Sequence, residues 1–335
     1  NKEETNESIV PLPATAPLVV GAMGLDAIMS LLPQVDEHKA LLLFPLEGDT
    51  QLRQHKRDNV IYFRPSYDKE LRALVDYTLN TKHKTSIAIV YESSRWGRNQ
   101  LSTLTTLLAD KGITPVAIAA YAQGTVETEE AVKTILKASP NVIFCLAQPR
   151  PAYTFICNAL NTGLHECLFL GLSQLAVIQK LLKTARGLDL IVTAVVPDVK
   201  TNKIPIVAEY KKTMQSFLSF RDDSPFYLEA FISMALLDAC LKKIIGPITM
   251  PAIIKACESF DTAHFKGIKI SFNSSDRSLS SAVWVNPGID QDWIAYDPSR
   301  RPSSLLRSYD EAPQGERKEP ARGEEPEGRL EPYER

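Results

Sequence analysis

Five short segments of the chain combine glycine, carboxylate, guanidinium and indole groups, and each follows an apolar run. They are residues 21–24 (GAMG), 45–49 (PLEGD), 92–97 (ESSRWG), 147–151 (AQPRP) and 172–174 (LSQ). Exposed backbone N–H groups at helix starts can hold a carboxylate or a phosphate. Glu47 and Asp49 can hold an ammonium group, and the indole of Trp96 offers a flat apolar wall. The chemistry that these segments indicate is recognition of a small ligand.

Each of these groups also has a purely structural interpretation, which the sequence leaves open. The glycines of residues 21–24 are compatible with simple turns, because their spacing lacks the pattern of a dinucleotide-binding fingerprint. The carboxylates of residues 45–49 are compatible with a solvated loop, and Trp96 with packing on a sheet. Arg64 and Arg150 are compatible with surface or hinge ion pairs.

Patterns typical of catalysis or of a metal site are missing from the sequence. It contains no GxxxxGK[ST], HExxH or GxSxG motif, and no histidine follows the carboxyl end of an expected strand. The five cysteines show no CxxC spacing and are expected in the core. A Cys240–Cys257 bridge is compatible with their spacing but is not established by it. We therefore predict no enzyme activity, no cofactor and no metal.

The charge balance excludes one class of partner. Lys+Arg 38 against Asp+Glu 40 give a net charge of −2, whereas binding of nucleic acid normally needs a basic stripe. Nucleic acid is therefore not an expected partner. No stretch approaches the roughly 20 apolar residues that span a bilayer, so no membrane span is expected. A length of 335 residues favours two compact units.

From Leu18 onward, short β-rich runs alternate with segments of helical periodicity. The runs are residues 18–20, 40–44, 60–63, 86–91, 114–121, 142–146, 167–170 and 190–196. Between them, segments such as 101–108 and 152–160 repeat apolar residues at helical spacing. This alternation predicts an α/β fold whose parallel sheet is covered on both faces. Ligands bind such sheets beyond the carboxyl ends of the strands, where the five segments lie.

After Pro197 the pattern changes to three successive helices, the last of which is opened by Thr249 and Pro251. Short strands are expected near residues 268–272, 282–285 and 293–296. Residues 1–17 are expected to form an extended lead-in. Residues 299–335 are expected to form a disordered charged tail, because they hold too little apolar area to offset their ordering entropy.

Eight motifs carry a resemblance to a known family. They are VVGAMG (19–24), FPLEGDTQLR (44–53), YFRPSYDKE (62–70), IAIVYESSRWGRNQL (87–101), GITPVAIAAYAQGTVETEEAV (112–132), TAVVPDV (193–199), PIVAEYKKTM (205–214) and SPFYLEAFISMALLDACL (224–241). In this order they resemble the branched-chain amino-acid (leucine/isoleucine/valine) type of ABC-transporter substrate-binding protein, which has the type I periplasmic-binding fold. The resemblance covers roughly residues 18–297.

The resemblance implies two Rossmann-like lobes that are joined by three hinge strands and close on a small ligand. The first lobe would comprise residues 18–66 and 199–280, the second residues 67–198 and 281–298, with crossings near residues 64–66, 197–200 and 279–282. Carried over position by position, the ligand contacts are Gly24, Leu46, Glu47 and Gly48 in the first lobe, Trp96, Gln148 and Ser173 in the second, and Phe226 at the cleft mouth.

The resemblance also implies a function. The protein would capture an amino acid or a related small polar ligand in the periplasm or elsewhere outside the cytoplasm, and deliver it to the membrane permease of an ABC transporter. The same fold serves as a ligand-sensing ectodomain of a receptor or an effector domain of a regulator, and it can carry an enzyme or a scaffold. The sequence leaves these alternatives open, because fold alone does not fix function.

The chain departs from the family pattern in two respects. Amino-acid binders of the family place a carboxylate where this chain has Ser173, so Glu47 would have to supply that charge from the opposite lobe. The family also opens with two strand–helix units before the segment that matches Val19, whereas here only residues 1–18 precede it. The first lobe would then lack its central strand. We therefore expect either a fragment or a degenerate member that binds ligand poorly on its own.

Overall fold

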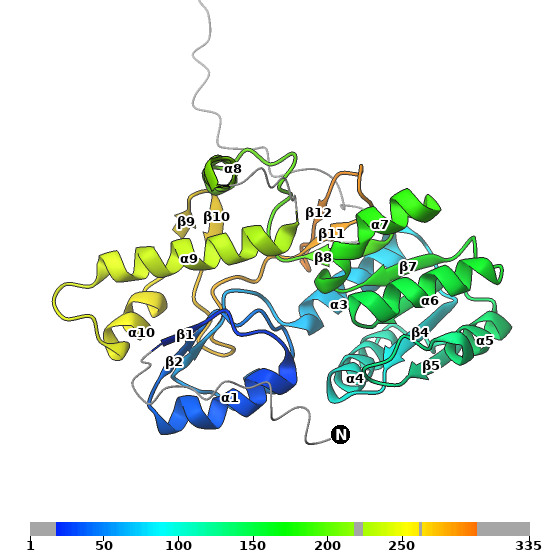
Figure 1. Cartoon of the computed structure of the whole chain (residues 1–335), viewed down its shortest axis with the longest axis horizontal. Coiled ribbons are helices and arrows are strands. Elements are labelled where there is room, and N and C mark those ends of the chain that lie inside the picture. The colour runs from blue at the N-terminus through cyan, green and yellow to red at the C-terminus, as the bar shows by residue number, and fades with distance from the viewer. Residues whose placement is uncertain (1–17, 218–223, 261–262, 300–335) are drawn as a thin grey trace, which may run out of the picture.

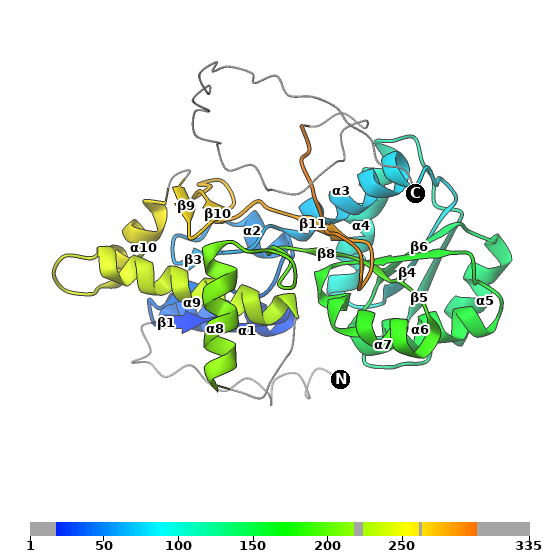
Figure 2. The same cartoon turned by 90° about the horizontal axis from the view of Figure 1, so that it is seen from above.

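The computed structural model of the protein describes residues 18–217, 224–260 and 263–299. This part of the chain forms two halves that lie side by side, each built on its own sheet (Figure 1; Figure 2). We call the half with the three-stranded sheet the first lobe and the half with the seven-stranded sheet the second lobe. The lobe boundaries given above stay a prediction. The expected lead-in and nearly all of the expected tail lie outside the described residues.

The first lobe is a parallel sheet with helices on both faces. Its elements are β1 (Leu18–Val20), α1 (Leu25–Glu37), β2 (Leu41–Leu43), α2 (Gln51–Gln54), β3 (Val60–Ile61), α8 (Pro205–Phe217), α9 (Pro225–Lys243), α10 (Met250–Glu258) and the antiparallel pair β9 (Ala263–Phe265) and β10 (Ile268–Ile270). The strand order is β1-β2-β3. Because side chains alternate between the faces of a strand, Leu42 joins the hydrophobic cluster of α1, whereas Leu41 and Leu43 join that of α8, α9 and α10.

The second lobe contains the longer sheet. Its elements are α3 (Tyr67–Asp76), the π-helical turn η1 (Tyr77–Thr81), β4 (Ile87–Glu92), α4 (Arg95–Ala109), β5 (Ala117–Tyr121), α5 (Glu129–Ala138), β6 (Val142–Leu146), α6 (Pro149–Asn161), β7 (Leu168–Gly171), the 3-10 turn η2 (Ser173–Leu175), α7 (Ala176–Arg186), β8 (Ile191–Ala194), β11 (Trp284–Asn286) and β12 (Ile294–Ala295). The order is β12-β11-β8-β7-β6-β4-β5, in which β11 runs antiparallel to both of its neighbours and all other neighbouring pairs are parallel.

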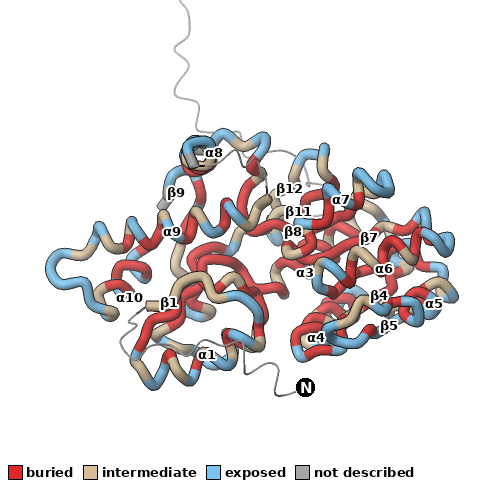
Figure 3. Tube along the Cα trace, in the orientation of Figure 1, coloured by how far each residue is buried: buried red, intermediate tan, exposed pale blue. Residues whose placement is uncertain are grey.

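Helices cover both faces of this sheet, and buried residues follow its strands through the middle of the lobe (Figure 3). Ile89 and Phe144 pack in the cluster that includes α3 and α4, whereas Val90 and Cys145 pack in the cluster that includes α5, α6 and α7. The alternation explains why the central strands β4 and β6 are apolar almost throughout, since both of their faces are covered. The predicted α/β class with a mostly parallel, helix-covered sheet is confirmed.

The first and last passages of the chain between the lobes run beside one another. The Tyr62 amide donates to the carbonyl of Arg277, and the Leu279 amide donates back to the carbonyl of Tyr62, both at 2.9 Å. The Ser280 amide donates to the carbonyl of Phe63, also at 2.9 Å. The connection between the lobes is therefore a hydrogen-bonded pair of segments. The third passage, which follows β8, packs in the same hydrophobic cluster through Val195, Val196 and Val199.

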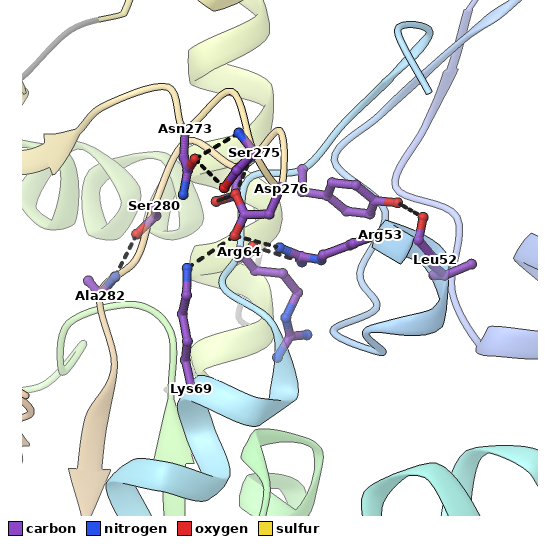
Figure 4. A network of polar contacts seen from close by, with 11 residues as sticks. Leu52, Arg53, Arg64, Lys69, Asn273, Ser275, Asp276, Ser280 and Ala282 are labelled. Atoms are coloured by element: carbon purple, nitrogen blue, oxygen red, sulfur yellow. Dashed lines mark hydrogen bonds and ion pairs between the residues drawn. The ribbon is translucent and has the colours of Figure 1, made fainter. Parts of the chain in front are cut away.

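One carboxylate ties both lobes to this pair of segments (Figure 4). Asp276 lies 3.1 Å from Nζ of Lys69 on α3 and 3.8 Å from Nη1 of Arg53 on α2, and its Oδ1 accepts a hydrogen bond from the Ser278 hydroxyl at 2.6 Å. Burial acts to raise the pKa of Asp276, but the Ser278 hydroxyl and the two cations outweigh it and lower that pKa. The hinge therefore contains a charged contact that remains ionised at neutral pH.

The first-lobe sheet is expected to open more easily than the second-lobe sheet. Among the described residues β1 pairs only with β2, and its three residues are only partly buried, so it presents an unpaired edge. We expect backbone amides in residues 18–63 to exchange faster than those in residues 87–170 under native conditions. Hydrogen exchange followed by mass spectrometry measures this, with the central strand β6 as an internal control. Equal protection of the two regions would show that the first-lobe sheet is as complete as the second.

Candidate ligand-binding cleft

A cavity of about 1110 Å³ lies between the two lobes. Loops that follow strands of both lobes line it, together with the first turn of α9, and its size slightly exceeds the usual range of small-molecule sites, roughly 300–1000 Å³. Six of the eight predicted ligand contacts line this cavity: Gly24, Leu46, Glu47, Trp96, Gln148 and Phe226. Segments far apart in the sequence therefore meet at one place, as the strand-end argument requires.

The other two predicted contacts, Gly48 and Ser173, are not among the residues that line the cavity. A Cβ atom at Gly48 would lie 2.7 Å from the ring of Tyr67, and the Gly48 carbonyl accepts the Tyr67 amide at 2.7 Å. Glycine is therefore required here for packing against the start of α3. Ser173 is buried and engaged by an internal ion cluster that is described below. Both residues support the wall of the cavity from behind.

The first-lobe wall is held by two adjoining loops. The Leu46 amide donates to the carbonyl of Ala22 at 2.9 Å, which extends the pairing of β1 and β2 toward the cavity. Gly24 has φ of 84°, a conformation that favours glycine. Its carbonyl accepts the amide of Ile28 at 3.0 Å, and this bond starts α1. The turn at Gly24 therefore places the N-terminus of α1 at the cavity.

Glu47 is a buried carboxylate in the cavity wall, with only 4% of its surface exposed. Its Oε1 accepts the amides of Gly48 at 2.9 Å and Asp49 at 3.1 Å, and its carboxylate is hydrogen-bonded to the Tyr67 side chain. Burial is the largest influence and raises the pKa of Glu47 to about 7, with Asp49 adding to the rise and Arg64 opposing it. Glu47 is therefore poised to change charge near neutral pH.

Trp96 is fixed in the second-lobe wall by the start of α4. The Ser94 hydroxyl accepts the Gly97 amide at 3.1 Å and donates to Glu92 at 2.8 Å. A Cβ atom at Gly97 would lie 1.9 Å from the carbonyl oxygen of Glu92, so only glycine fits there. The indole and the Tyr67 ring pack in a T-shaped arrangement, with centroids 6.2 Å apart. The ESSRWG segment thus sets the position of a rigid aromatic surface at the cavity.

A buried ion cluster lies where the two lobes meet. Arg64 Nη2 donates to Glu70 Oε1 at 2.8 Å and to the Ser173 hydroxyl at 2.6 Å, and its Nη1 lies 3.7 Å from Glu229 on α9. The Ser173 amide and the Thr193 hydroxyl both donate to Glu70 Oε2. All five residues are buried. Burial is the largest influence on Glu229 and raises its pKa, although Arg64 opposes the rise.

Sequence reasoning missed several residues of the cavity wall. Tyr67 directly follows the first expected crossing, and Gln174 belongs to the LSQ segment, so position alone could have pointed to them. Asn286 and Trp293 come from the end of the folded chain, where no motif marks them. The side-chain amide of Asn286 donates to Oε1 of Gln179 at 3.0 Å. These two residues are 107 positions apart, so no local pattern reveals their contact.

Two further properties concern the described residues alone. Within them, no group of three or more His, Cys, Asp or Glu side chains is placed to hold a metal ion. None of the helices in the ranges given above is long and apolar enough to cross a membrane.

Comparison with protein families decides what kind of cleft this is. The sequence model described as periplasmic binding protein matches residues 15–287, a range that includes most of both lobes and nearly all of the cavity wall. The chain belongs to the periplasmic binding protein family. The resemblance drawn from the eight motifs is thereby confirmed. The family and its fold are those of ligand-binding proteins rather than of enzymes.

Solved structures share the fold of this periplasmic binding protein. A possible leucine/isoleucine/valine-binding protein from Rhodopirellula baltica SH 1 is 22% identical, with a TM-score of 0.75 over 87% of this chain and 79% of the other. A branched chain amino acid ABC transporter protein from Thermus thermophilus with bound valine is 15% identical, with a TM-score of 0.69 over 84% and 77%. An ABC transporter substrate-binding protein from Desulfitobacterium hafniense in complex with Leu is 16% identical, with a TM-score of 0.67 over 85% and 81%. No curated protein sequence matches the chain significantly.

Proposed function

We propose that this chain is the extracytoplasmic solute-binding protein of an ABC-type uptake system, and that it captures an amino acid or a related small polar ligand. The observation that carries the proposal is the cavity between the lobes, where strand-end loops of both lobes converge with a carboxylate and an indole in its wall. A ligand that contacts both walls would favour closure of the lobes. The partner that receives the ligand is a membrane permease.

The choice of ligand class rests on the relatives and on the wall. Two of the similar structures hold valine or leucine. The wall of this cavity has groups for both parts of such a ligand. Trp96 and Phe226 can contact an apolar side chain, and Glu47 can bind an amino group. L-leucine and L-valine are therefore the first probes to use.

Removing the indole of Trp96 is expected to weaken binding by about 1–3 kcal/mol, because a large apolar surface would no longer cover the ligand. Calorimetric titration of L-leucine into wild-type protein and the Trp96→Ala variant measures the change. Trp96→Phe is the matched control, since it keeps a ring at the wall and should lose less. Circular dichroism must show that both variants remain folded, because Trp96 also packs on Tyr67. Equal affinity for wild type and Trp96→Ala would remove this residue from the site.

A further inference from the structure

Amino-acid binders of the family place a carboxylate in the second lobe, at the position where this chain has Ser173. Ser173 carries no charge, and its hydroxyl is already bound by Arg64 at 2.6 Å and by Glu70 at 3.3 Å. Glu70 is fully buried and lies outside the cavity wall. Asp198 does line the cavity, but its carboxylate oxygens accept the amides of Lys200 and Thr201, as well as the Thr201 hydroxyl.

Glu47 is the remaining carboxylate in the wall, and its geometry is that of a prepared acceptor. Two backbone amides fix its Oε1, and it is almost completely buried. Among the described residues that line the cavity, Arg64 carries the only guanidinium group. Its charge is shared between Glu70 and Glu229. Arg64 lowers the pKa of Glu47 but does not outweigh burial, so an ionised Glu47 is only partly compensated by the protein and can bind a cation.

We propose that the ligand carries an ammonium group and that Glu47, in the first lobe, holds this group. This inference rests on the proposed solute-binding function and deepens it by naming the charge that the site selects. Carboxylate and ammonium form a charge-assisted hydrogen bond, which is strongest where water is excluded. The charge contact would thus lie in the opposite lobe from the one that the family resemblance implies.

Proton linkage follows from the surroundings of Glu47. Burial raises the pKa of Glu47 to about 7. Three groups face its carboxylate: Arg64 from the first passage and the Tyr67 side chain on α3 lower this pKa, and Asp49 on the same loop raises it. An ammonium binds only the ionised form well, so Glu47 must release its proton on binding. With that pKa, about a tenth of Glu47 is ionised at pH 6 and about nine tenths at pH 8. Affinity is therefore expected to rise about tenfold between these two pH values.

Three matched probes separate the charges of the ligand. They are L-leucine, 3-methylbutylamine, which keeps the amine and lacks the carboxylate, and 4-methylpentanoate, which keeps the carboxylate and lacks the amine. In calorimetric titrations, we expect L-leucine and 3-methylbutylamine to bind about tenfold more tightly at pH 8 than at pH 6. We expect 4-methylpentanoate to bind at least tenfold more weakly than either of them. Glu47→Gln should remove the pH dependence and weaken amine binding at pH 8 at least tenfold. Asp238→Asn, on the exposed face of α9, removes a carboxylate outside the cavity. It should change neither the pH dependence nor the affinity for amines.

Failure of this inference is distinguishable from failure of the proposed function. If solutes bind but affinity is the same at both pH values and in Glu47→Gln, the binding protein stands and the ammonium site at Glu47 falls. Equal binding of 4-methylpentanoate and L-leucine also overturns the inference. If no solute binds at either pH, the proposed function fails and this inference fails with it.

A second, independent observation concerns two buried cysteines of the first lobe. Cys240 on α9 and Cys257 on α10 are fully buried, and their Sγ atoms lie 3.0 Å apart as free thiols. A disulfide needs the two sulfurs at about 2.05 Å, so a small adjustment brings them into bonding range. We infer that this pair forms a disulfide under oxidising conditions. The two thiols lose two protons and two electrons as the S–S bond forms, and a disulfide oxidant such as oxidised glutathione is reduced to two thiols.

Counting thiols tests this pair. The chain is equilibrated with a glutathione redox buffer, denatured in the presence of iodoacetamide and weighed by mass spectrometry. Three labels are expected, because two of the five cysteines are paired, and reduction before labelling should restore five. The Cys240→Ser variant should take four labels under both conditions. Five labels on the oxidised wild-type chain would overturn the inference.

Discussion

Replacing Arg64 with alanine is expected to destabilise the protein by about 3–5 kcal/mol, because removing one partner of a buried ion pair leaves the other charge uncompensated. Arg64 is 1% exposed and faces Glu70 at 2.8 Å and Glu229 at 3.7 Å, so two carboxylates would lose their cation together. The loss should fall on the contact between the lobes, since Glu70 lies on α3 and Glu229 on α9. Urea denaturation of the wild-type protein and the variant measures the difference in the free energy of unfolding.

A surface ion pair provides the control for this measurement. Lys133 lies 2.6 Å from Glu130 on α5, and both side chains are exposed. Solvent and salt screen exposed pairs, so Lys133→Ala should change the free energy of unfolding little. If Arg64→Ala costs no more than Lys133→Ala, the buried cluster does not stabilise the contact between the lobes.

Replacing Glu47 with glutamine is expected to make the protein more stable at pH 8 while weakening its binding of amines. A carboxyl whose folded-state pKa is raised favours folding at low pH, and that contribution is lost as pH rises through the folded-state value. For Glu47 the window runs from its ordinary value of 4.5 to about 7. At 1.36 kcal/mol per pKa unit, the variant should gain about 3 kcal/mol over the wild-type protein at pH 8. Glutamine can still accept the Gly48 and Asp49 amides.

The pH profile of the difference distinguishes this cause from a general packing effect. Thermal or urea unfolding of both proteins at pH 4.5 and pH 8 should give nearly equal stabilities at the lower pH and a gain for Glu47→Gln at the higher pH. A difference that is the same at both pH values would contradict the raised pKa. The expected combination of greater stability and weaker binding is typical of a residue kept for function.

Much of the fold and part of the candidate site follow from local sequence patterns. The apolar runs predict the strands of the second lobe because each buried parallel strand is apolar on both faces. The strand-end rule then brings Gly24, Glu47, Trp96 and Gln148 to one cavity, as the structure shows. Their contact with a ligand stays a prediction.

The rest depends on contacts between distant parts of the chain. Arg64 and Ser173 are 109 positions apart, and nothing local to either residue indicates that they bind one another. The sequence therefore left Arg64 as a surface or hinge ion pair, whereas burial within a cluster is what gives it importance. The family resemblance predicts Gly48 as a ligand contact, whereas the close ring of Tyr67, which leaves no room for a side chain, depends on a tertiary contact that the resemblance does not reveal.

The central claim is that the cavity between the lobes binds a small polar solute, and a thermal-shift panel tests it most directly. Wild-type protein is heated with each of a set of amino acids, amines, carboxylates and sugars at pH 8. A ligand present at 100 times its Kd stabilises the folded state by about 2.7 kcal/mol, which should raise Tm by several degrees. We expect at least one amine-bearing solute to do so for wild type, and to do so less for Trp96→Ala. A panel in which no solute raises Tm would contradict the account.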